Sequence, residues 1–228
     1  MLHKTRGIVL HYIRYRDTSI ITKIYTERFG LQSYIVNGVR SKSAKSKIAL
    51  FQPLTLLDMV VYHRENSINR ISEIHIGRPY HSLHTEIKKS SIALFLAELL
   101  QQLLHEEEEN TELFDFIFDG LTYFDSQSEA YENFHLQFLL QLSRFLGLEI
   151  SSHIDILKEV EEHETLPPQS EAFGEAIDHF LQSAWHESLQ ITNAQRRTIL
   201  DIVLSFYRYQ LGIKTDSKSL MIFRDVFS

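Results

Sequence analysis

Residues 19–36, SIITKIYTERFGLQSYIV, contain two runs with the composition of β-strands. The first run, residues 19–26, is rich in β-branched side chains, which pack well on a pleated strand. The second run, residues 31–36, carries an alternating pattern, and Phe29-Gly30 supplies a turn between the two. This stretch therefore predicts two short, consecutive strands.

Three further strands are expected in the first 80 residues, at 7–15, 54–62 and 68–76. Arg16-Asp17-Thr18 is the turn expected after the first of them. Five short strands are too few for a full β-sandwich, and they suit a small barrel. We therefore predict a five-stranded OB-fold β-barrel over residues 1–80.

The apolar period changes from 2 to 3.6 after Arg78-Pro79, which is the signature of amphipathic helices. An acidic run at residues 106–109 ends the first helix, and Gly147 ends the third. Gly212 stands where a helix C-terminus favours glycine. The helices expected in residues 81–228 lie at about 87–104, 111–124, 129–145, 170–184, 193–211 and 217–227. Between 148 and 169 the pattern is weak. The fold class is therefore α+β multidomain, a barrel followed by an all-α helical domain.

Charge divides the chain at the same place as the change of period. Residues 1–80 hold 13 Lys and Arg against 5 Asp and Glu, a net charge of +8, whereas residues 81–228 hold 10 against 25, a net charge of −15. The whole-chain pI of about 5.9 hides this difference. A strongly basic domain attracts polyanions, so the division points to nucleic acid as a partner of the barrel.

Several classes of protein are excluded or disfavoured by missing signals. The chain has no cysteine, which excludes disulfides, cysteine-ligated zinc and a cysteine nucleophile. It has no P-loop, GxGxxG, GxSxG or HExxH motif, so we expect neither an enzyme nor a cofactor nor a metal site. No apolar run is long enough to span a membrane, and the N-terminus does not read as a signal peptide, so we expect a cytoplasmic protein.

The basic segment 40–47 is the sharpest local feature, because its cations alternate with Ser and Ala and no acid interrupts them. Such a segment suits phosphate contacts, although many basic loops are only solvated surface. Tyr15 and Tyr34 are the better candidates for stacking on bases, whereas Phe29 and Phe51 are expected in the core. The predicted DNA-binding residues are Lys4, Arg6, Arg14, Arg16, Lys23, Tyr34, Arg40, Lys42, Lys45 and Lys47.

A known family shares short motifs with nearly the whole chain. The motifs in the barrel are Gly7-Ile8-Val9-Leu10, residues 17–21, Tyr25-Thr26 with Gly30, Val36-Asn37-Gly38-Val39-Arg40 and Leu50-Phe51-Gln52-Pro53. Those in the helical part are Arg144-Phe145-Leu146-Gly147 and Lys218-Ser219-Leu220. Each motif is short, but their order and spacing together resemble RecO, the bacterial family of DNA repair and recombination mediators.

The resemblance implies an OB-fold that binds single- and double-stranded DNA, followed by a helical domain. It also implies a non-catalytic, nucleoid-associated protein that anneals complementary strands and, with RecR, helps to load RecA onto DNA coated with single-strand binding protein (SSB). Members of the family commonly carry a four-cysteine zinc module after the stretch that matches residues 145–147. This chain has no cysteine, and its residues 151–168 are acidic instead, so zinc is not expected here.

The resemblance further implies that the helical domain receives the acidic C-terminal tail of SSB, which ends in Phe. A pocket for that tail needs cations beside an apolar cleft. Phe206 is expected in the helix core. The candidate tail-binding residues are Arg196, Arg197, Tyr207, Arg208, Leu211, Lys214 and Lys218.

Two other functions stay open at the level of sequence. One is a non-catalytic protein adapter, whose helical domain binds partners while the barrel contacts RNA or an acidic protein. The other is a nuclease or phosphotransferase, which needs metal-binding acids near the basic face. The acids of the first 80 residues are spread over five segments, and we therefore expect no cleavage of DNA.

Overall fold

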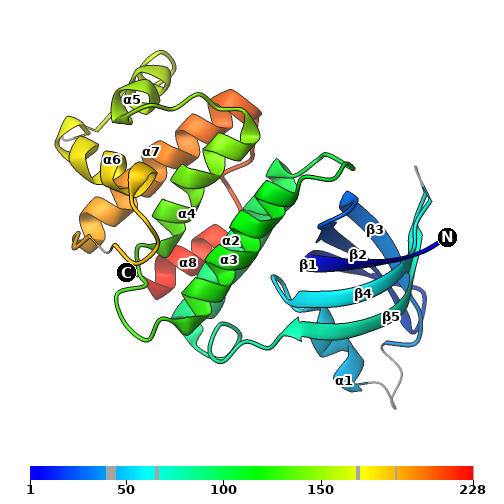
Figure 1. Ribbon diagram of the computed structural model, residues 1–228. Helices are drawn as coiled ribbons and strands as arrows, with labels where there is room; N and C mark the ends of the chain where they lie inside the picture. Colours follow the sequence, from blue (N-terminus) through cyan, green and yellow to red (C-terminus); the bar gives the residue numbers. More distant parts are fainter. Residues whose placement is uncertain (40–44, 65–66, 168–169, 188, 228) are drawn as a thin grey trace. The chain divides into compact units, whose positions relative to one another are not determined.

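The computed structural model describes residues 1–39, 45–64, 67–167, 170–187 and 189–227 (Figure 1). The chain divides into two compact units, residues 1–121 and 122–228. The first unit contains the strands, helices α1 and α2 and most of helix α3, and the second contains the end of α3 and helices α4 to α8. The expected boundary at residue 80 coincides with the change from strands to helices, and as a domain boundary it stays a prediction.

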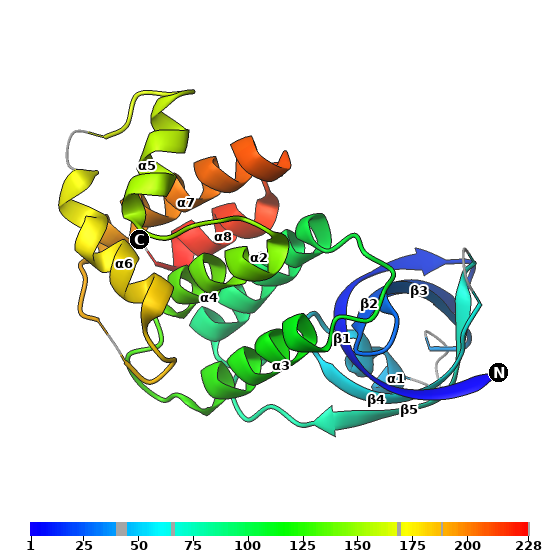
Figure 2. The ribbon, with the colours of Figure 1, turned by 45° about the horizontal axis from the view of Figure 1, so that its top comes forward.

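The predicted five-stranded barrel is confirmed. Its strands are β1 (Leu2–Tyr15), β2 (Ser19–Thr26), β3 (Gly30–Val36), β4 (Leu56–Tyr62) and β5 (Asn69–Arg78). They close in the order β1-β2-β3-β5-β4, and every pair is antiparallel except β3 with β5. Figure 2 shows the strands curving around the barrel. This closed order is the one expected of an OB-fold.

Strand β1 begins five residues earlier than the alternation predicted. Its first part pairs with β4, from Leu2 opposite Tyr62 to Ile8 opposite Leu56, and its second part pairs with β2. One long strand therefore serves both neighbours and closes the barrel. Because the pairing lies far along the chain, the local pattern of residues 2–6 does not reveal it.

The barrel core is made of inward-facing aliphatic residues that include Val9, Ile20 and Ile24. Between β3 and β4 the chain forms α1 (Lys45–Ile48) and the 3-10 turn Ala49–Phe51, which brings the Phe51 ring into the core at 1% exposure. The prediction that Phe51 belongs to the core is confirmed.

Helix α2 (Ile87–Leu103) has an apolar middle, residues 92–97, and ten of its residues are buried. Helix α3 (Thr111–Ser126) begins after Asn110, whose side-chain Oδ1 accepts a hydrogen bond from the Leu113 N–H at 3.0 Å. Near its start, the Phe114 ring stacks on Tyr25 of β2, with 6.1 Å between ring centroids. Burial of these rings therefore fastens the first part of α3 to the barrel.

The second unit is helical. Its elements are α4 (Phe134–Leu142), α5 (His153–Glu161), α6 (Gly174–Gln182), α7 (Asn193–Leu211) and α8 (Lys218–Val226), with 3-10 turns at Ser143–Leu146 and Glu171–Phe173. The bounds predicted for α7 are confirmed, because a capping box between Thr192 and Gln195 starts it and Gly212, at φ +69°, ends it. The helix expected from residue 129 begins only at Phe134.

Helix α5 was not predicted, and it orders the described part of residues 151–168 without cysteine. Ser152 and Asp155 form a capping box at its start. Asp178 of α6 accepts hydrogen bonds from the backbone N–H of His153 at 2.6 Å and from its ring Nδ1 at 2.7 Å. Ile156, Leu157 and Val160 are buried. Burial of these side chains and the hydrogen bonds with Asp155 and Asp178 therefore stabilise this segment.

Candidate nucleic-acid interface

The strand register places exposed cations and apolar side chains together on the outside of the barrel. Lys23 of β2 lies opposite His11 of β1 and Ser33 of β3. Because Ile24 and Thr22 on either side of Lys23 face the core at 0% exposure, alternation directs Lys23 outward. We call this surface of β1, β2 and β3 the outer face.

A second row of the outer face is apolar and ends in an arginine. Ile13, Ile21 and Ile35 lie opposite one another on β1, β2 and β3, and Arg70 of β5 continues the row beside Ile35. Tyr62 of β4 lies opposite Arg70. Ile13 is 53% exposed and Tyr62 50% exposed, so the row offers apolar and aromatic contacts next to cations.

The turn after β1 and the residues that directly follow β3 meet at one end of this face. The Ser19 Oγ donates a hydrogen bond to the Asn37 side chain at 2.9 Å, which joins the start of β2 to the segment that follows β3. Arg16 lies in the turn just before Ser19, and its guanidinium is 5.2 Å from the centroid of the Tyr15 ring. Lys47 on α1 is exposed. The turn and the residues that directly follow β3 are therefore neighbours.

The predicted basic segment is described only from Lys45 onward. Arg40 and Lys42 lie outside the described residues. Lys45 is the first residue of α1. Arg14 and Lys23 are exposed, as predicted for residues that contact DNA. Their contact with DNA stays a prediction.

Tyr34 is not available for stacking on a base, and this prediction is wrong. Its side chain is fully buried in the barrel core, at 0% exposure. The physical reason is its register: Tyr34 lies opposite Thr22, which faces the core as well. Burial also raises the pKa of the Tyr34 hydroxyl. Tyr15 is half-buried, and it remains a candidate for stacking on a base.

Arg6 is engaged within the protein. Its guanidinium donates to both carboxylate oxygens of Glu27, at 3.0 and 2.8 Å, and to Asp115 of α3 at 2.7 Å. It also lies 4.9 and 5.0 Å from the ring centroids of Phe114 and Phe118. The hydrogen bonds from Arg6 lower the pKa of the Glu27 carboxyl. These surroundings favour a role in holding α3, and they do not support the predicted contact of Arg6 with DNA.

Lys4 faces a different part of the barrel, where charges of both signs meet. A groove of about 390 Å³ on β1, β4 and β5 is lined by Lys4 and Arg6 together with Glu27, Asp58 and Glu73. Phosphate would meet carboxylates there. Of the predicted cations, those on the outer face and its loops are therefore the better placed.

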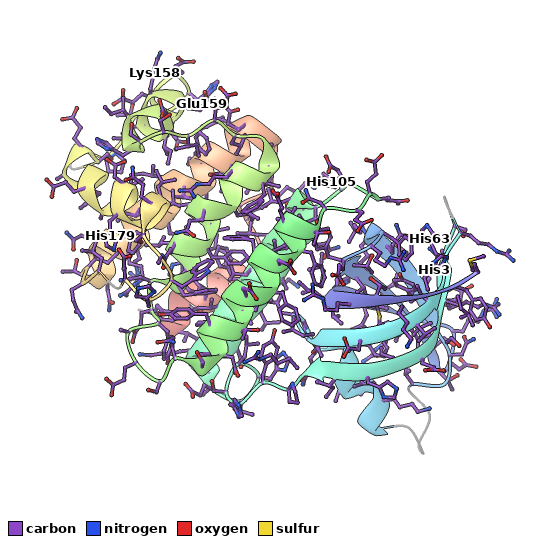
Figure 3. All side chains as sticks on the ribbon, in the orientation of Figure 1. His3, His63, His105, Lys158, Glu159 and His179 are labelled. Carbon is purple, nitrogen blue, oxygen red and sulfur yellow. The ribbon has the colours of Figure 1, made fainter. Side chains whose placement is uncertain are left out.

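A polar network missed at the sequence level shapes the loop between β4 and β5. The buried Asn69 donates to Gln32 Oε1 at 2.9 Å and accepts from the Arg64 N–H at 2.8 Å. His63 in this loop stacks on Phe29, with ring centroids 4.0 Å apart, and His3 meets Phe29 edge-on. Figure 3 shows His3 and His63 at the same end of the barrel. Phe29 is thus only partly buried.

The acidic run forms a strap against the barrel. We call residues 106–109 the acidic strap, and it follows the end of α2 near His105 (Figure 3). The Leu31 N–H donates to the Glu106 carbonyl at 2.9 Å. A Cβ on Gly30, which has φ +57°, would lie 2.3 Å from that carbonyl oxygen. Gly30 therefore permits an approach that no other residue permits.

The candidates for tail binding do not form one site. Tyr207 is buried in the core, its hydroxyl donating to the Leu139 carbonyl at 2.7 Å, so its prediction is wrong; the expected burial of Phe206 is confirmed. Arg208 pairs with Glu164 at 2.7 Å. It lies twelve residues along α7 from Arg196, roughly 18 Å at the rise of an α-helix.

One small cleft in the second unit does bring cations to apolar side chains. Arg196 and Arg197 of α7 line it together with Phe223, Arg224 and Phe227 of the C-terminal segment. Arg196 is 8% exposed and donates to Asn133 at 2.7 Å. Sequence reasoning missed Arg224, although its spacing from Leu220 and Phe223 puts it near the edge of an apolar helix face. Leu211, Lys214 and Lys218 are exposed elsewhere.

Two further properties concern only the residues that the structure describes. Among them, no group of three or more His, Asp or Glu side chains is placed to hold a metal ion, although Glu27, Asp58 and Glu73 line one groove. In the same residues, no helix combines the length and the apolar character that crossing a membrane requires.

Comparison with known proteins gives matches over both parts of the chain. The family model described as Recombination protein O N terminal matches residues 1–80, and that described as Recombination protein O C terminal matches residues 84–165. The DNA repair protein RecO of Flavobacterium psychrophilum is 33% identical over 243 residues, which cover 99% of each chain. Its counterpart from Bacteroides fragilis is 46% identical over 149 residues, which cover 65% of this chain and 62% of the relative. The chain therefore belongs to the RecO family of DNA repair proteins.

Proposed function

We propose that this protein is a DNA-binding recombination mediator. In this role it binds single- and double-stranded DNA, anneals complementary strands and, together with RecR, helps to load RecA onto SSB-coated single strands. The observation that supports it best is the outer face, where the exposed Lys23 and Arg70 flank an apolar row. The chain itself catalyses no bond cleavage in this proposal.

The physical argument concerns the repulsion between two DNA backbones. Annealing brings two phosphate chains together, and cations that neutralise phosphates release condensed counterions and lower that repulsion. Lys23 and Arg70 supply charge on the outer face, and Ile13 and Tyr62 supply apolar and aromatic contact. Such a surface holds a strand without reading its sequence, as an annealing protein requires.

The decisive experiment is annealing of complementary oligonucleotides that are coated with SSB. We expect the protein to accelerate duplex formation, and a rate equal to that without the protein would contradict the proposal. Bare oligonucleotides serve as the control for a contribution from SSB itself. Incubation of labelled DNA with magnesium tests for a nuclease, and we expect the DNA to stay intact.

For the SSB tail we propose the cleft beside Arg197 and Arg224 as the docking position. It combines guanidinium groups with the rings of Phe223 and Phe227, which suits the acidic residues of the tail. Its volume of about 10 Å³ is that of one water, so the terminal Phe would lie across its mouth. Replacing Arg197 and Arg224 by Ala should weaken binding of a fluorescent tail peptide at least tenfold. The same change at Arg208 and Lys214 is the control, and an equal loss there would remove the cleft from the proposal.

A further inference from the structure

A second pocket of the helical unit is lined by aromatic rings and belongs to neither surface described above. Its volume is about 100 Å³, whereas one water needs about 10–15 Å³ by the same measure. The end of α3, the loop before α4 and the segment between α6 and α7 surround it. The rings that line it are those of Tyr123, Phe124, Tyr131, Phe134, Phe180 and Trp185.

Trp185 is the only tryptophan of the chain, and it stands at the centre of these rings. Its ring centroid is 5.4 Å from that of Phe134 and 6.3 Å from that of Tyr123. The Phe124 and Phe134 rings are stacked at 4.4 Å and form part of the core. Trp185, Tyr123 and Tyr131 are only half-buried, so ring faces are open to a ligand.

Hydrogen bonds from polar side chains to backbone carbonyls hold the segment that carries Trp185 in place. Gln137 of α4 donates from Nε2 to the carbonyls of Ser183, at 3.1 Å, and Ala184, at 3.0 Å. His179 of α6, labelled in Figure 3, bonds the Glu187 carbonyl at 3.2 Å. The side-chain amide of Asn133 donates to the Leu189 carbonyl at 2.7 Å. The pocket is therefore already formed before any ligand arrives.

Gln137 is itself an unusual lining residue. It is 5% exposed and lies in the pocket wall, and its hydrogen bonds are all made through Nε2. Among the described residues, nothing donates to its Oε1. That oxygen is not sealed from solvent, and a ligand that donates to it would replace water. The pocket wall thus offers an acceptor to a ligand that carries N–H groups.

The charges at the pocket have one sign. Glu129 and Glu187 line it and are exposed, and of the described lining residues none is Lys or Arg. His186 also lies there. Aromatic faces attract cations, and carboxylates at the rim add to that attraction. Both features oppose an acidic ligand.

We propose that this pocket receives an arginine side chain from a basic segment of a partner protein. A guanidinium is planar, stacks on aromatic rings and donates several N–H bonds at once. Trp185 and Tyr123 would face its plane, while Gln137 Oε1 and the two carboxylates would accept its hydrogen bonds. This interaction goes beyond the proposed function, because it requires no DNA and no SSB tail.

The test uses Trp185 as a built-in fluorescent reporter in the full chain at pH 8 and low salt. The probe is an acetylated, amidated pentapeptide with one arginine among glycines. The matched ligand is the same peptide with citrulline, which keeps the shape of the side chain but has no charge. We expect a saturable change of emission with the arginine peptide, and at least a tenfold weaker response to citrulline and to lysine.

Matched variants of the protein distinguish binding in the pocket from a general effect of negative charge on the peptide. The variant Glu129→Gln with Glu187→Gln should weaken binding at least fivefold, because both rim carboxylates are lost. The variant Glu149→Gln with Glu175→Gln removes two exposed acids elsewhere in the same unit, and it should bind as the unchanged protein does. An additional variant, Gln137→Met, should weaken binding while the melting temperature reports on folding.

Five results would overturn the proposal. The first four are the absence of a saturable response, equal responses to arginine and citrulline, equal losses in the two double variants, and, as the last of these four, competition by an acidic peptide that ends in Phe. The last result would assign the pocket to an acidic tail. A response to lysine as strong as that to arginine would overturn the choice of arginine.

Discussion

Several cations of the barrel and several arginines of the helical unit differ in whether they have a partner within the protein. In the barrel, Arg14, Lys23 and Lys47 are exposed, and none of them forms an ion pair with another described residue. In the helical unit, Arg196, Arg208 and Arg224 bond to Asn133, Glu164 and Asp201. Net charge alone does not reveal this difference. A cation that already has a carboxylate partner neutralises little phosphate.

The largest effect on DNA affinity is expected when the exposed barrel cations are replaced by acidic residues. Replacing Arg14, Lys23 and Lys47 by Glu should lower affinity for a single-stranded oligonucleotide about 100-fold at low salt and reduce the salt slope by roughly 2. The measurement is fluorescence anisotropy over a salt series. The physical reason is the loss of about 0.7 released counterions for each phosphate contact on a single strand.

The control reverses three exposed lysines of the helical unit, Lys158, Lys214 and Lys218. It changes the net charge by the same amount, and we expect less than a threefold effect on affinity. If both triple variants lose affinity equally, DNA responds to the total charge of the protein, and the outer face is not the site.

The second prediction concerns Gly30, which holds the acidic strap close to the barrel. Gly30→Ala should lower the free energy of unfolding by about 3 kcal/mol, since it combines backbone strain at positive φ with a clash against backbone oxygen. Gly38 has φ +73° with nothing within 4 Å of the added Cβ, so Gly38→Ala carries the strain alone, about 1 kcal/mol. Urea unfolding of both variants measures the difference, and equal losses would show that the strap contact is weak.

Much of the fold was predictable because it depends on local pattern. The β-branched run of β2, and α7 between the Thr192 cap and Gly212, carry their signals within a few residues. Helix α5 was not predictable from periodicity, since its apolar residues are few and its stability depends on Asp178, more than twenty residues away. Local pattern does not reveal partners that are distant in sequence.

The candidate site was predictable only in part, for a related reason. Composition identifies the basic barrel, but it does not show which side of a strand a residue faces or which acid lies beside it. Tyr34 failed as a predicted contact because it faces the core, and Arg6 stays a prediction whose guanidinium is already paired with Asp115 of α3. Arg70 was missed because its place on the outer face follows from the pairing of β5 with β3.

The third prediction tests Arg6, a barrel cation that has carboxylate partners within the protein, as Arg208 and Arg224 have in the helical unit. Arg6→Met should lower the free energy of unfolding by about 1–2 kcal/mol, a modest value because the pair is partly exposed. It should leave the affinity for DNA within twofold. A loss of DNA binding without a loss of stability would return Arg6 to the interface.

The same pair gives a pH dependence with a definite sign. Arg6 holds the folded-state pKa of Glu27 below its ordinary value of 4.5, so the pair stabilises the fold fully above that value. The stabilisation is lost as the pH falls through the lower, folded-state pKa. The difference in unfolding free energy between the unchanged protein and Arg6→Met should therefore shrink in acid. A constant difference between pH 7 and pH 3 would contradict the assigned ion pair.

The smallest effect is expected at the acidic strap, whose glutamates are exposed next to the basic barrel. Replacing Glu107, Glu108 and Glu109 by Gln should raise affinity for single-stranded DNA two- to fivefold at low salt, because it removes repulsion close to the path of the backbone. The gain should vanish near 0.5 M salt, where screening extends over only a few ångströms. The control is the same change at Glu149, Glu171 and Glu175 of the helical unit, which should leave affinity unchanged. A gain of equal size in both variants would mean that the strap acts through net charge, and its position against Gly30 would then have no bearing on DNA.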